Sequence, residues 1–417
     1  MDYDVCIIGA GWAGFNAALA AVRLGKKACI AEAGQIGGTC LNRGCIPTKA
    51  FVHYSKSGLS LSDIQKKKNE TVARLSDGMS YLVRSKKIDY FQGKAIIHKD
   101  GSVSIGADKE IRPGYILIAS GSAPKDLPGF KIDHQKIVSS DDMLSLEEAP
   151  KKLLIIGGGV IGCEFASIFA RLGSDVTIVE IAGQLLPGLD TQVSKRLASA
   201  FQKAGINVFL GKGAQDLDLS GFDKVLLSVG RSAITDGLWE DGTGIKTDKG
   251  FIGVDRELKT ARPNIFAAGD CIGGYMLAHV ASYEGELAVN NMFAKPQKRD
   301  YSVIPSSIFT SPEAGSVGLS EEEAGQFGAT YKALTVHFLS IGMSHILGDT
   351  QGFAKVIVDL KSGKILGAAI IGLQATELVN IFSVIMKNGI TIQELKKTIF
   401  AHPSISEIVA EVAKSFD

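Results

Sequence analysis

The residues best suited to chemistry in this 417-residue chain are two closely spaced cysteines, Cys40 and Cys45, in the run GGTCLNRGCIPTK. Pro47 is typical of the first turn of a helix, and Lys49 follows about one turn later. A thiolate near a helix N-terminus and a lysine has a lowered pKa, which makes it a better nucleophile and a better leaving group in disulfide exchange. The run therefore favours a redox pair that alternates between dithiol and disulfide.

Two other interpretations of the pair explain less. A zinc site needs about four ligands, and of the possible extra ligands only His53 lies near the pair in sequence, so no metal is expected. An inert buried pair would leave the adjacent glycines and lysine unexplained. Cys6 and Cys29 fall in predicted strands and Cys163 in a predicted helix, so these three are expected to be small buried residues. The role of Cys271 stays open.

The charge balance excludes several classes of partner. The chain has 45 basic and 44 acidic residues, interspersed, with a formal net charge of +1. Neither a nucleic-acid-binding surface nor a polybasic membrane anchor is expected. The apolar stretch 5–22 follows Asp2 and Asp4 and is broken by glycines, so it is predicted to be folded protein rather than a signal sequence. We expect no membrane association and a cytoplasmic location, where a close cysteine pair is more often catalytic than structural.

The elements that must position such a pair include one unit that occurs twice. A strand at 5–8 leads into a glycine-rich turn, a helix follows, and a second strand ends at Glu32; the same order runs from 153–156 to Glu180. In both units the acid lies 23 positions after the first glycine. The glycines are Gly9, Gly11 and Gly14 in the first unit and Gly157, Gly159 and Gly162 in the second.

This unit is typical of dinucleotide binding. The glycines let the backbone approach a pyrophosphate at a helix N-terminus, and the acid accepts hydrogen bonds from ribose hydroxyls. The alternative is a tight strand-to-helix turn without a ligand, which would not require the acid. Ile181 and Ala182 rather than arginines follow Glu180, so the second unit favours NAD(H) over NADP(H).

Two further features could contribute to these sites. The predicted strand 264–268 ends at Gly269 and Asp270, where a carboxylate would face a ligand or cap the following helix; the sequence favours neither. Near the C-terminus, Ser404 and Glu407 fit a helix capping box. That pattern does not account for His402. This histidine lies five residues from a carboxylate that could orient and polarise its ring, as in a general acid/base. Both interpretations can hold together.

At this point the chain resembles the FAD-dependent pyridine-nucleotide disulfide oxidoreductases. The similarity covers essentially the whole chain, through the cysteine run, the two nucleotide units, Gly269–Asp270, and the segments 276–279, 311–313 and 402–407. It implies an α/β fold with two Rossmann-like dinucleotide-binding domains and a C-terminal α+β dimerisation domain. The expected domains are 1–143 and 263–300 for FAD, 144–262 for NAD, and 301–417 for the dimer interface.

The resemblance also implies the contacts of each cofactor. The expected FAD contacts are Gly9, Gly11, Gly14, Glu32, Thr39, Lys49, Ala95, Ser120, Gly121, Asp270 and Ala278. The expected NAD contacts are Gly157, Gly159, Gly162, Glu164, Glu180 and Gly230. Lys49 and Glu164 would form an ion pair beside the flavin, although an acid in a first helical turn is also favoured by the helix dipole.

The activity that the resemblance implies is oxidation of a dihydrolipoyl dithiol carried by a separate protein. His402, with Glu407, would act from the other subunit of a homodimer, Cys40 would exchange with the substrate, and electrons would pass from Cys45 through FAD to NAD. The alternative is an NAD(P)H-dependent reductase of another small disulfide or persulfide. Members with a second C-terminal redox pair are disfavoured because no cysteine follows Cys271. A flavoprotein without turnover is disfavoured by the intact site residues.

The sequence pattern of the last part of the chain predicts an α+β unit. In addition, two stretches of the chain depart from the usual pattern of the family. Strands are expected at 354–360 and 364–371, and helices near 373–387 and 392–398. The stretch 211–220 is too short for the β meander that the family usually carries there. Phe400 stands where the family usually has the first histidine of a His-Ala-His-Pro run.

Overall fold

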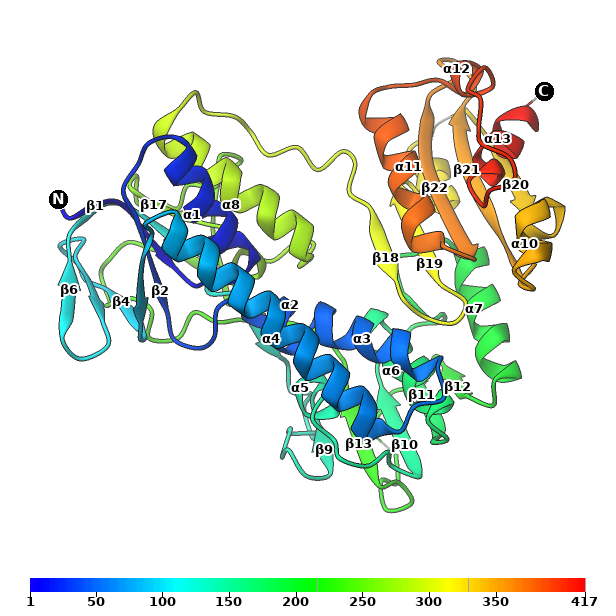
Figure 1. The fold of residues 1–417 in the computed structure, drawn as a ribbon, viewed down its shortest axis with the longest axis horizontal. Coiled ribbons are helices and arrows are strands. Elements are labelled where there is room, and N and C mark those ends of the chain that lie inside the picture. The colour runs from blue at the N-terminus through cyan, green and yellow to red at the C-terminus, as the bar shows by residue number, and fades with distance from the viewer. Residues whose placement is uncertain (216, 329, 417) are drawn as a thin grey trace.

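The computed structural model describes residues 1–215, 217–328 and 330–416 (Figure 1). Its first domain is built on a parallel sheet with strand order β17-β7-β1-β2-β3. Side chains of β1 alternate between two cores, with Val5 and Ile7 facing helices α1 and α8, and Cys6 and Ile8 facing a three-stranded meander. The strands are β1 (Tyr3–Ile8), β2 (Ala28–Glu32), β3 (Asp89–Gln92), β7 (Pro113–Ile118) and β17 (Ile265–Ala267); the helices are α1 (Trp12–Arg23) and α8 (Ala278–Phe293); the meander is β4 (Ala95–Ile97), β5 (Val103–Ile105) and β6 (Lys109–Ile111).

The second domain repeats this plan. Its parallel sheet has the order β12-β11-β10-β13-β9, and the apolar face of α6 packs on it. The elements are β9 (Ile137–Val138), β10 (Lys152–Ile156), α6 (Val160–Arg171), β11 (Asp175–Glu180), α7 (Thr191–Lys203), β12 (Asn207–Leu210) and β13 (Lys224–Leu227). The prediction of two Rossmann-like domains is confirmed. In the described residues between β12 and β13 there is no further strand, as the short sequence predicts, although residue 216 lies outside them.

Three helices between β2 and β3 connect these domains. The cysteine run forms α2 (Gly38–Arg43) and the start of α3 (Cys45–Ser55), and α4 (Leu61–Ser85) runs from the second domain back to the first (Figure 1). Phe51 of α3 and Ile64 of α4 share a core with Phe165 and Phe169 of α6. The redox pair therefore lies on helices that the second domain helps to hold.

The third domain has an antiparallel sheet with order β18-β19-β22-β21-β20. One sheet face packs under α11 and α13, and the other, through Phe353 and Ile371, packs on the second domain. Its elements are β18 (Ser306–Ile308), β19 (Ala314–Gly318), α9 (Glu321–Gln326), β20 (Tyr331–His337), α10 (Gly342–Ile346), β21 (Gly352–Asp359), β22 (Ile365–Gly372), α11 (Ala375–Lys387), α12 (Ile392–Leu395) and α13 (Glu407–Lys414). The predicted strands and the first predicted helix are present, whereas the helix expected at 392–398 is shorter.

Strand pairing bears on the expected division into domains. The strand β9 belongs to the second sheet, and β8 (Ser122–Pro124) pairs with β14 (Arg231–Ala233) as a two-stranded link between the domains. The boundaries at 143 and 262 remain proposals, and this pairing favours crossing points nearer 125–136 and 231. None of the helices in the described ranges is both long and apolar enough to cross a membrane.

Candidate active site

The turn before α2 and the junction between α2 and α3 bring the two cysteines together. Gly37 precedes α2 with a φ of 92°. A Cβ atom on Gly44, between the helices, would lie 2.9 Å from the Thr39 carbonyl oxygen, so only glycine fits at this tight junction. The Cys40 and Cys45 thiols hydrogen-bond to each other, with Cys45 exposed and Cys40 half-buried.

This contact makes the two thiols chemically different. The pKa of Cys45 is lowered to about 7 by the hydrogen bond with Cys40 and, less strongly, by the charge of Lys49, against the opposing effects of burial and Glu164. The same hydrogen bond, together with burial, raises the pKa of Cys40. In the dithiol state the negative charge therefore resides on Cys45, at the N-terminus of α3, where the helix dipole also favours it.

Lys49 is held by a carboxylate of the second domain. Its Nζ lies 2.9 Å from both carboxylate oxygens of Glu164, which is only 3% exposed. Glu164 also accepts a hydrogen bond from the Phe309 N–H at 2.9 Å, and Lys49 lies over the Phe309 ring, 4.8 Å from its centroid. The expected ion pair thus joins all three domains next to the cysteine pair.

The first glycine turn fits a dinucleotide. A Cβ on Gly9 would lie 2.3 Å from the Ala119 oxygen, and a Cβ on Gly14 would lie 1.9 Å from the Gly9 oxygen, so both glycines are required by chain packing. A Cβ on Gly11 would meet nothing closer than 3.9 Å. No side chain of the described residues caps α1, so its first N–H groups and the space beside Gly11 are available to a pyrophosphate.

The second glycine turn has the same construction. A Cβ on Gly157 would lie 2.4 Å from the Ser228 oxygen, and one on Gly162 would lie 2.0 Å from the Gly157 oxygen. A Cβ on Gly159 would meet no atom within 4 Å, and α6 also has no side-chain cap in the described chain. Two sites of one design therefore lie on either side of the cysteine helices.

Each expected ribose-binding acid is fixed by its own glycine turn. Glu32 accepts the N–H groups of Ala10 and Gly34, each at 2.6 Å. Glu180 makes the two equivalent bonds, to Gly158 at 2.6 Å and Ala182 at 2.7 Å. These bonds hold each carboxylate at the end of its strand before any sugar arrives. A cavity of about 650 Å³, lined in part by Gly34, begins beside the first acid.

The remaining predicted FAD contacts lie at the ends of elements around the first sheet. Asp270 begins a short 3₁₀ helix, η1 (Asp270–Ile272), with Gly269 before it, so it does not act as the helix cap that the sequence allowed. The others are Thr39 in α2, Ala95 at the start of β4, Ser120 and Gly121 after β7, and Ala278 at the start of α8. Gly230, an expected NAD contact, precedes β14 with a φ of 113°.

Asp270 has two partners that the sequence did not single out. The Ser122 hydroxyl donates to the Asp270 carboxylate at 2.5 Å, and Arg231 donates to the Ser122 hydroxyl and carbonyl oxygens, both at 2.7 Å. Arg231 Nε lies 3.9 Å from Asp270. The only signal for Arg231 in the sequence is its position directly after Gly230. The pairing of β8 with β14 brings Arg231 next to Ser122 and Asp270.

The histidine and glutamate near the C-terminus form the second predicted pair of site residues. His402 Nδ1 lies 2.8 Å from Glu407 Oε1, and the His402 side chain is 77% exposed. This contact, with the Ser404 N–H bond at 2.9 Å, lowers the pKa of Glu407. The capping-box prediction is half wrong: α13 begins at Glu407 rather than after Ser404, and the Ser404 hydroxyl donates to Ala401 instead.

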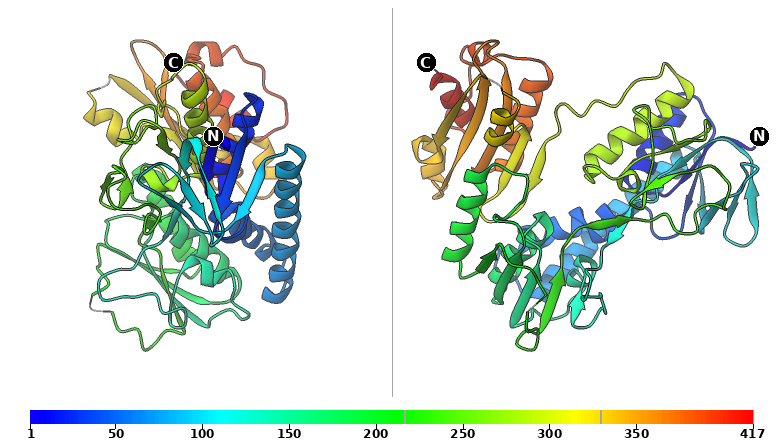
Figure 2. Two further views of the ribbon diagram at one scale, coloured as in Figure 1. Left: turned by 90° about the vertical axis from the view of Figure 1, so that its left-hand side faces the viewer. Right: turned by 180° about the vertical axis from the view of Figure 1, so that it is seen from behind.

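The two predicted pairs of site residues are separate within one chain. No hydrogen bond or ion pair in the described parts of the chain joins His402 or Glu407 to the cysteines. The helix α13 lies with α11 on the face of the third sheet away from the second domain, and Figures 1 and 2 show it far from α2 and α3.

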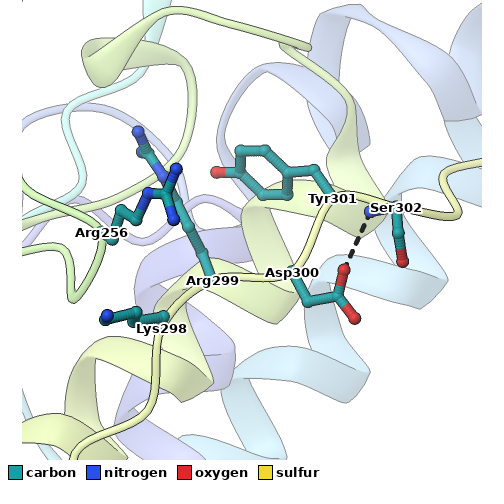
Figure 3. A pocket seen from close by; sticks show the side chains of 6 residues that line it. All are labelled: Arg256, Lys298, Arg299, Asp300, Tyr301 and Ser302. Atoms are coloured by element: carbon teal, nitrogen blue, oxygen red, sulfur yellow. Dashed lines mark hydrogen bonds between the residues drawn. The ribbon is translucent and has the colours of Figure 1, made fainter.

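A second hollow, of about 570 Å³, lies on the linker before the third domain and includes none of the predicted site residues (Figure 3). Arg256, Lys298 and Arg299 line it, and the Arg299 guanidinium lies over the Tyr301 ring. The Tyr301 hydroxyl donates to buried Glu284. Glu284 in turn accepts the Gly269 N–H at 2.7 Å, so the linker supports the Gly269–Asp270 turn.

Comparison with known proteins identifies the class. Residues 3–285 match the pyridine nucleotide-disulphide oxidoreductase family, and residues 304–413 match the dimerisation domain of that family. The chain belongs to the pyridine nucleotide-disulphide oxidoreductases, whose cofactors FAD and NAD fit the two glycine turns described above.

Relatives within this family give a more particular likeness. The chain is 36% identical to the dihydrolipoyl dehydrogenase of Chlamydia muridarum, over 99% of this chain and 96% of the relative. It is 34% identical to that of Bacillus subtilis, over 100% and 98%. It also resembles the structure of RclA, an HOCl-induced flavoprotein disulfide reductase from Escherichia coli, with a TM-score of 0.92, 30% identity and full coverage of both chains.

Proposed function

We propose that this chain is an NAD-dependent dihydrolipoyl dehydrogenase that uses Cys40 and Cys45 as its redox disulfide. The observation that carries the proposal is the pair of unequal thiols, with Lys49 and Glu164 beside them, between two dinucleotide sites. The substrate dithiol belongs to a lipoyl group on a separate protein. The similarity to curated dihydrolipoyl dehydrogenases over nearly full length supports this substrate.

The exchange balances in two steps. A substrate thiolate attacks the Cys40 sulphur, the disulfide bond between Cys40 and Cys45 breaks, and Cys45 leaves as a thiolate. The Cys45 thiol has a pKa of about 7, which makes its thiolate a good leaving group. The second substrate thiol then displaces Cys40 and closes the oxidised lipoyl ring. Two electrons now reside in the cysteine pair. FAD, when bound, supplies the two-electron chemistry that connects this dithiol with NAD⁺.

His402 is the proposed base for the substrate thiols. Glu407 occupies its Nδ1, which leaves Nε2 on an exposed ring to accept a proton. Since His402 does not contact the cysteines of its own chain, it acts on the pair of the partner subunit in a homodimer. The family dimerisation domain in residues 304–413 supports this arrangement.

The second nucleotide is proposed to be NAD rather than NADP. Glu180 lies where the adenosine ribose would bind, and a carboxylate there repels a 2′-phosphate. The next residue, Ile181, is 76% exposed and brings no positive charge. The expected cytoplasmic location remains a prediction.

The decisive test measures initial rates of NAD⁺ and NADP⁺ reduction by dihydrolipoamide. We expect turnover with NAD⁺, and its loss in Cys45→Ser and in His402→Gln. His337→Gln, an exposed histidine of the same domain, is the matched control and is expected to keep the wild-type rate. Bound FAD with no dihydrolipoamide turnover would overturn the proposal. The likeness to RclA would then favour an NADH-driven reductase of another disulfide.

A further inference from the structure

The turn formed by Gly269 and Asp270 is held by hydrogen bonds on both of its residues. Gly269 has a φ of 79° and a ψ of −160°, a backbone conformation that is essentially limited to glycine. Its N–H donates to Oε2 of Glu284 at 2.7 Å. The Asp270 carboxylate accepts the Ser122 hydroxyl at 2.5 Å. The predicted FAD contact Asp270 therefore depends on an anchor at Glu284 as well as on its own bond to Ser122.

Glu284 is a buried carboxylate on α8 that bridges two segments of the chain. Its exposed fraction is 3%, and a Cβ on the next residue, Gly285, would lie 2.1 Å from the Ala13 oxygen, so α8 packs directly on α1 here. A buried carboxylate needs hydrogen-bond donors. One oxygen takes the Gly269 N–H, and the other, Oε1, takes the Tyr301 hydroxyl. One side chain thus connects the turn with the segment that carries Tyr301.

Tyr301 lies in the linker between α8 and β18, which leads into the third domain. Two side chains pack on its ring (Figure 3): the Arg299 guanidinium lies 5.3 Å from the ring centroid, and the Tyr275 ring meets it edge-on at 5.4 Å. These contacts fix the ring, and with it the hydroxyl that donates to Glu284. The course of the linker therefore determines where this donor lies.

We propose that Glu284 and Tyr301 are positioning residues for FAD: Glu284 holds the Gly269–Asp270 turn, and Tyr301 holds the Glu284 carboxylate. The linker thereby sets how firmly the first domain retains its cofactor. This inference rests on FAD as the cofactor of the family and on the predicted contact of Asp270 with it. It does not depend on the dithiol substrate or on NAD.

The protonation state of Glu284 gives this role a pH signature. Burial raises the pKa of Glu284, against the opposing effects of the bonds from Tyr301 and Gly269 and of a nearby positive charge. The titratable and charged groups that face it from the linker and the turn are Tyr301, Arg299, Asp270 and Cys271. A carboxylate accepts a stronger hydrogen bond than a neutral acid does. Loss of the Tyr301 hydroxyl would raise the pKa of Glu284 further, so its bond to Gly269 would weaken at a higher pH than in the wild type.

The test measures the loss of FAD from the full-length holoprotein, with released FAD separated by ultrafiltration and quantified by its fluorescence. Tyr301→Phe keeps the ring and removes the hydroxyl. We expect FAD to leave about fivefold faster near pH 8, the effect of one hydrogen bond, and the ratio to the wild type to grow as the pH falls towards 6. NADH-dependent ferricyanide reduction, which bypasses the disulfide, should be unchanged per bound FAD. A wild-type rate of FAD loss in this variant would overturn the proposal.

Tyr283→Phe is the matched control. Tyr283 precedes Glu284 on α8, and its hydroxyl accepts the Asp300 N–H at 2.9 Å, so it ties the same linker to the same helix without reaching the turn. This variant should keep the wild-type rate of FAD loss and its pH profile. Equal acceleration in Tyr283→Phe and Tyr301→Phe would contradict the inference, because attachment of the linker to α8 would then explain both.

Glu284→Gln assigns the pH dependence. The amide keeps an oxygen for the Gly269 N–H but carries no charge and does not titrate. We expect FAD to leave about tenfold faster than in the wild type, the difference between a charged and a neutral acceptor, without the pH dependence of Tyr301→Phe. Adding Tyr301→Phe to this variant should not restore that dependence. If the double variant shows it, a group other than Glu284 titrates and the assignment is wrong.

These measurements separate this inference from the proposed function. The assay of FAD loss contains neither lipoyl substrate nor NAD. A wild type that does not oxidise dihydrolipoamide would overturn only the proposed substrate. A wild type that turns over, with FAD held equally well by Tyr301→Phe, would overturn only the positioning role.

Discussion

Lys49 Nζ lies 2.9 Å from both carboxylate oxygens of Glu164, so the helix that begins at Cys45 is tied to the second dinucleotide domain. Glu164 is almost fully buried, and it needs a partner because an unpaired buried carboxylate is costly. The ion pair therefore has two effects. It fixes α3 against α6, and it sets the net charge next to the Cys45 sulphur.

Lys49→Met is expected to reduce the thiolate population of Cys45. The pKa of Cys45 is lowered to about 7, so its thiolate forms as pH rises through about 7. Removing the lysine charge, with Glu164 left behind, raises this pKa, and the iodoacetamide reactivity of Cys45 at pH 7 should fall about fivefold for a shift of about one pH unit. The measurement is alkylation against pH in the reduced protein, located by peptide mass spectrometry. A midpoint that stays at pH 7 would show that the hydrogen bond with Cys40 alone sets it.

Glu407→Gln tests the orientation of His402. The variant keeps a side chain of the same shape but loses the charge that lies 2.8 Å from Nδ1. We expect the kcat for dihydrolipoamide oxidation to fall about tenfold, within the range for loss of an orienting partner, while NADH-dependent ferricyanide reduction is unchanged. Glu411→Gln, on the same helix and paired with Lys414, is the control. Equal losses in both variants would indicate a general effect on α13.

The dinucleotide domains were predictable because their evidence is local. The strand, glycine turn, helix and acid of each unit lie within about 25 consecutive residues. The bonds of Glu32 to Ala10 and of Glu180 to Gly158 follow directly from that order. The cysteine pair was equally local, since one glycine-linked helix junction holds both thiols.

The contacts that sequence could not supply join distant segments. Arg231 reaches Ser122 only because β8 and β14 pair across more than 100 residues. In the sequence, Lys355 is one polar residue in an otherwise apolar strand. Its partner Asp190 lies in another domain, so the sequence does not indicate the ion pair. Ser404 and Glu407 have the spacing of a capping box, but α13 starts two residues later than that pattern predicts, with Ile405 buried in the core of the third domain.

Lys355→Met is expected to destabilise the contact between the second and third domains. Lys355 and Asp190 are 2% and 1% exposed and 2.8 Å apart, and Glu321 also binds the ammonium group. Removing the cation leaves a buried carboxylate without its partner, a loss of about 3–5 kcal/mol. The thermal unfolding midpoint should fall by several degrees, and Lys355→Met combined with Asp190→Asn should recover part of the loss. A single variant as stable as the wild type would mean that water replaces the lysine.

Gly159→Ala and Gly162→Ala separate nucleotide binding from folding. A Cβ at Gly159 meets nothing within 4 Å, and its φ of −74° suits alanine, so this variant should fold and bind FAD normally. The added methyl group would occupy space that the NAD pyrophosphate needs, and we expect the KM for NAD⁺ to rise about tenfold, the effect of about 1.4 kcal/mol. A Cβ at Gly162 would lie 2.0 Å from the Gly157 oxygen, so that variant should lose stability before it loses affinity. Initial-rate kinetics and thermal unfolding of both proteins are the measurements. An unchanged KM in folded Gly159→Ala would show that the pyrophosphate does not approach this turn.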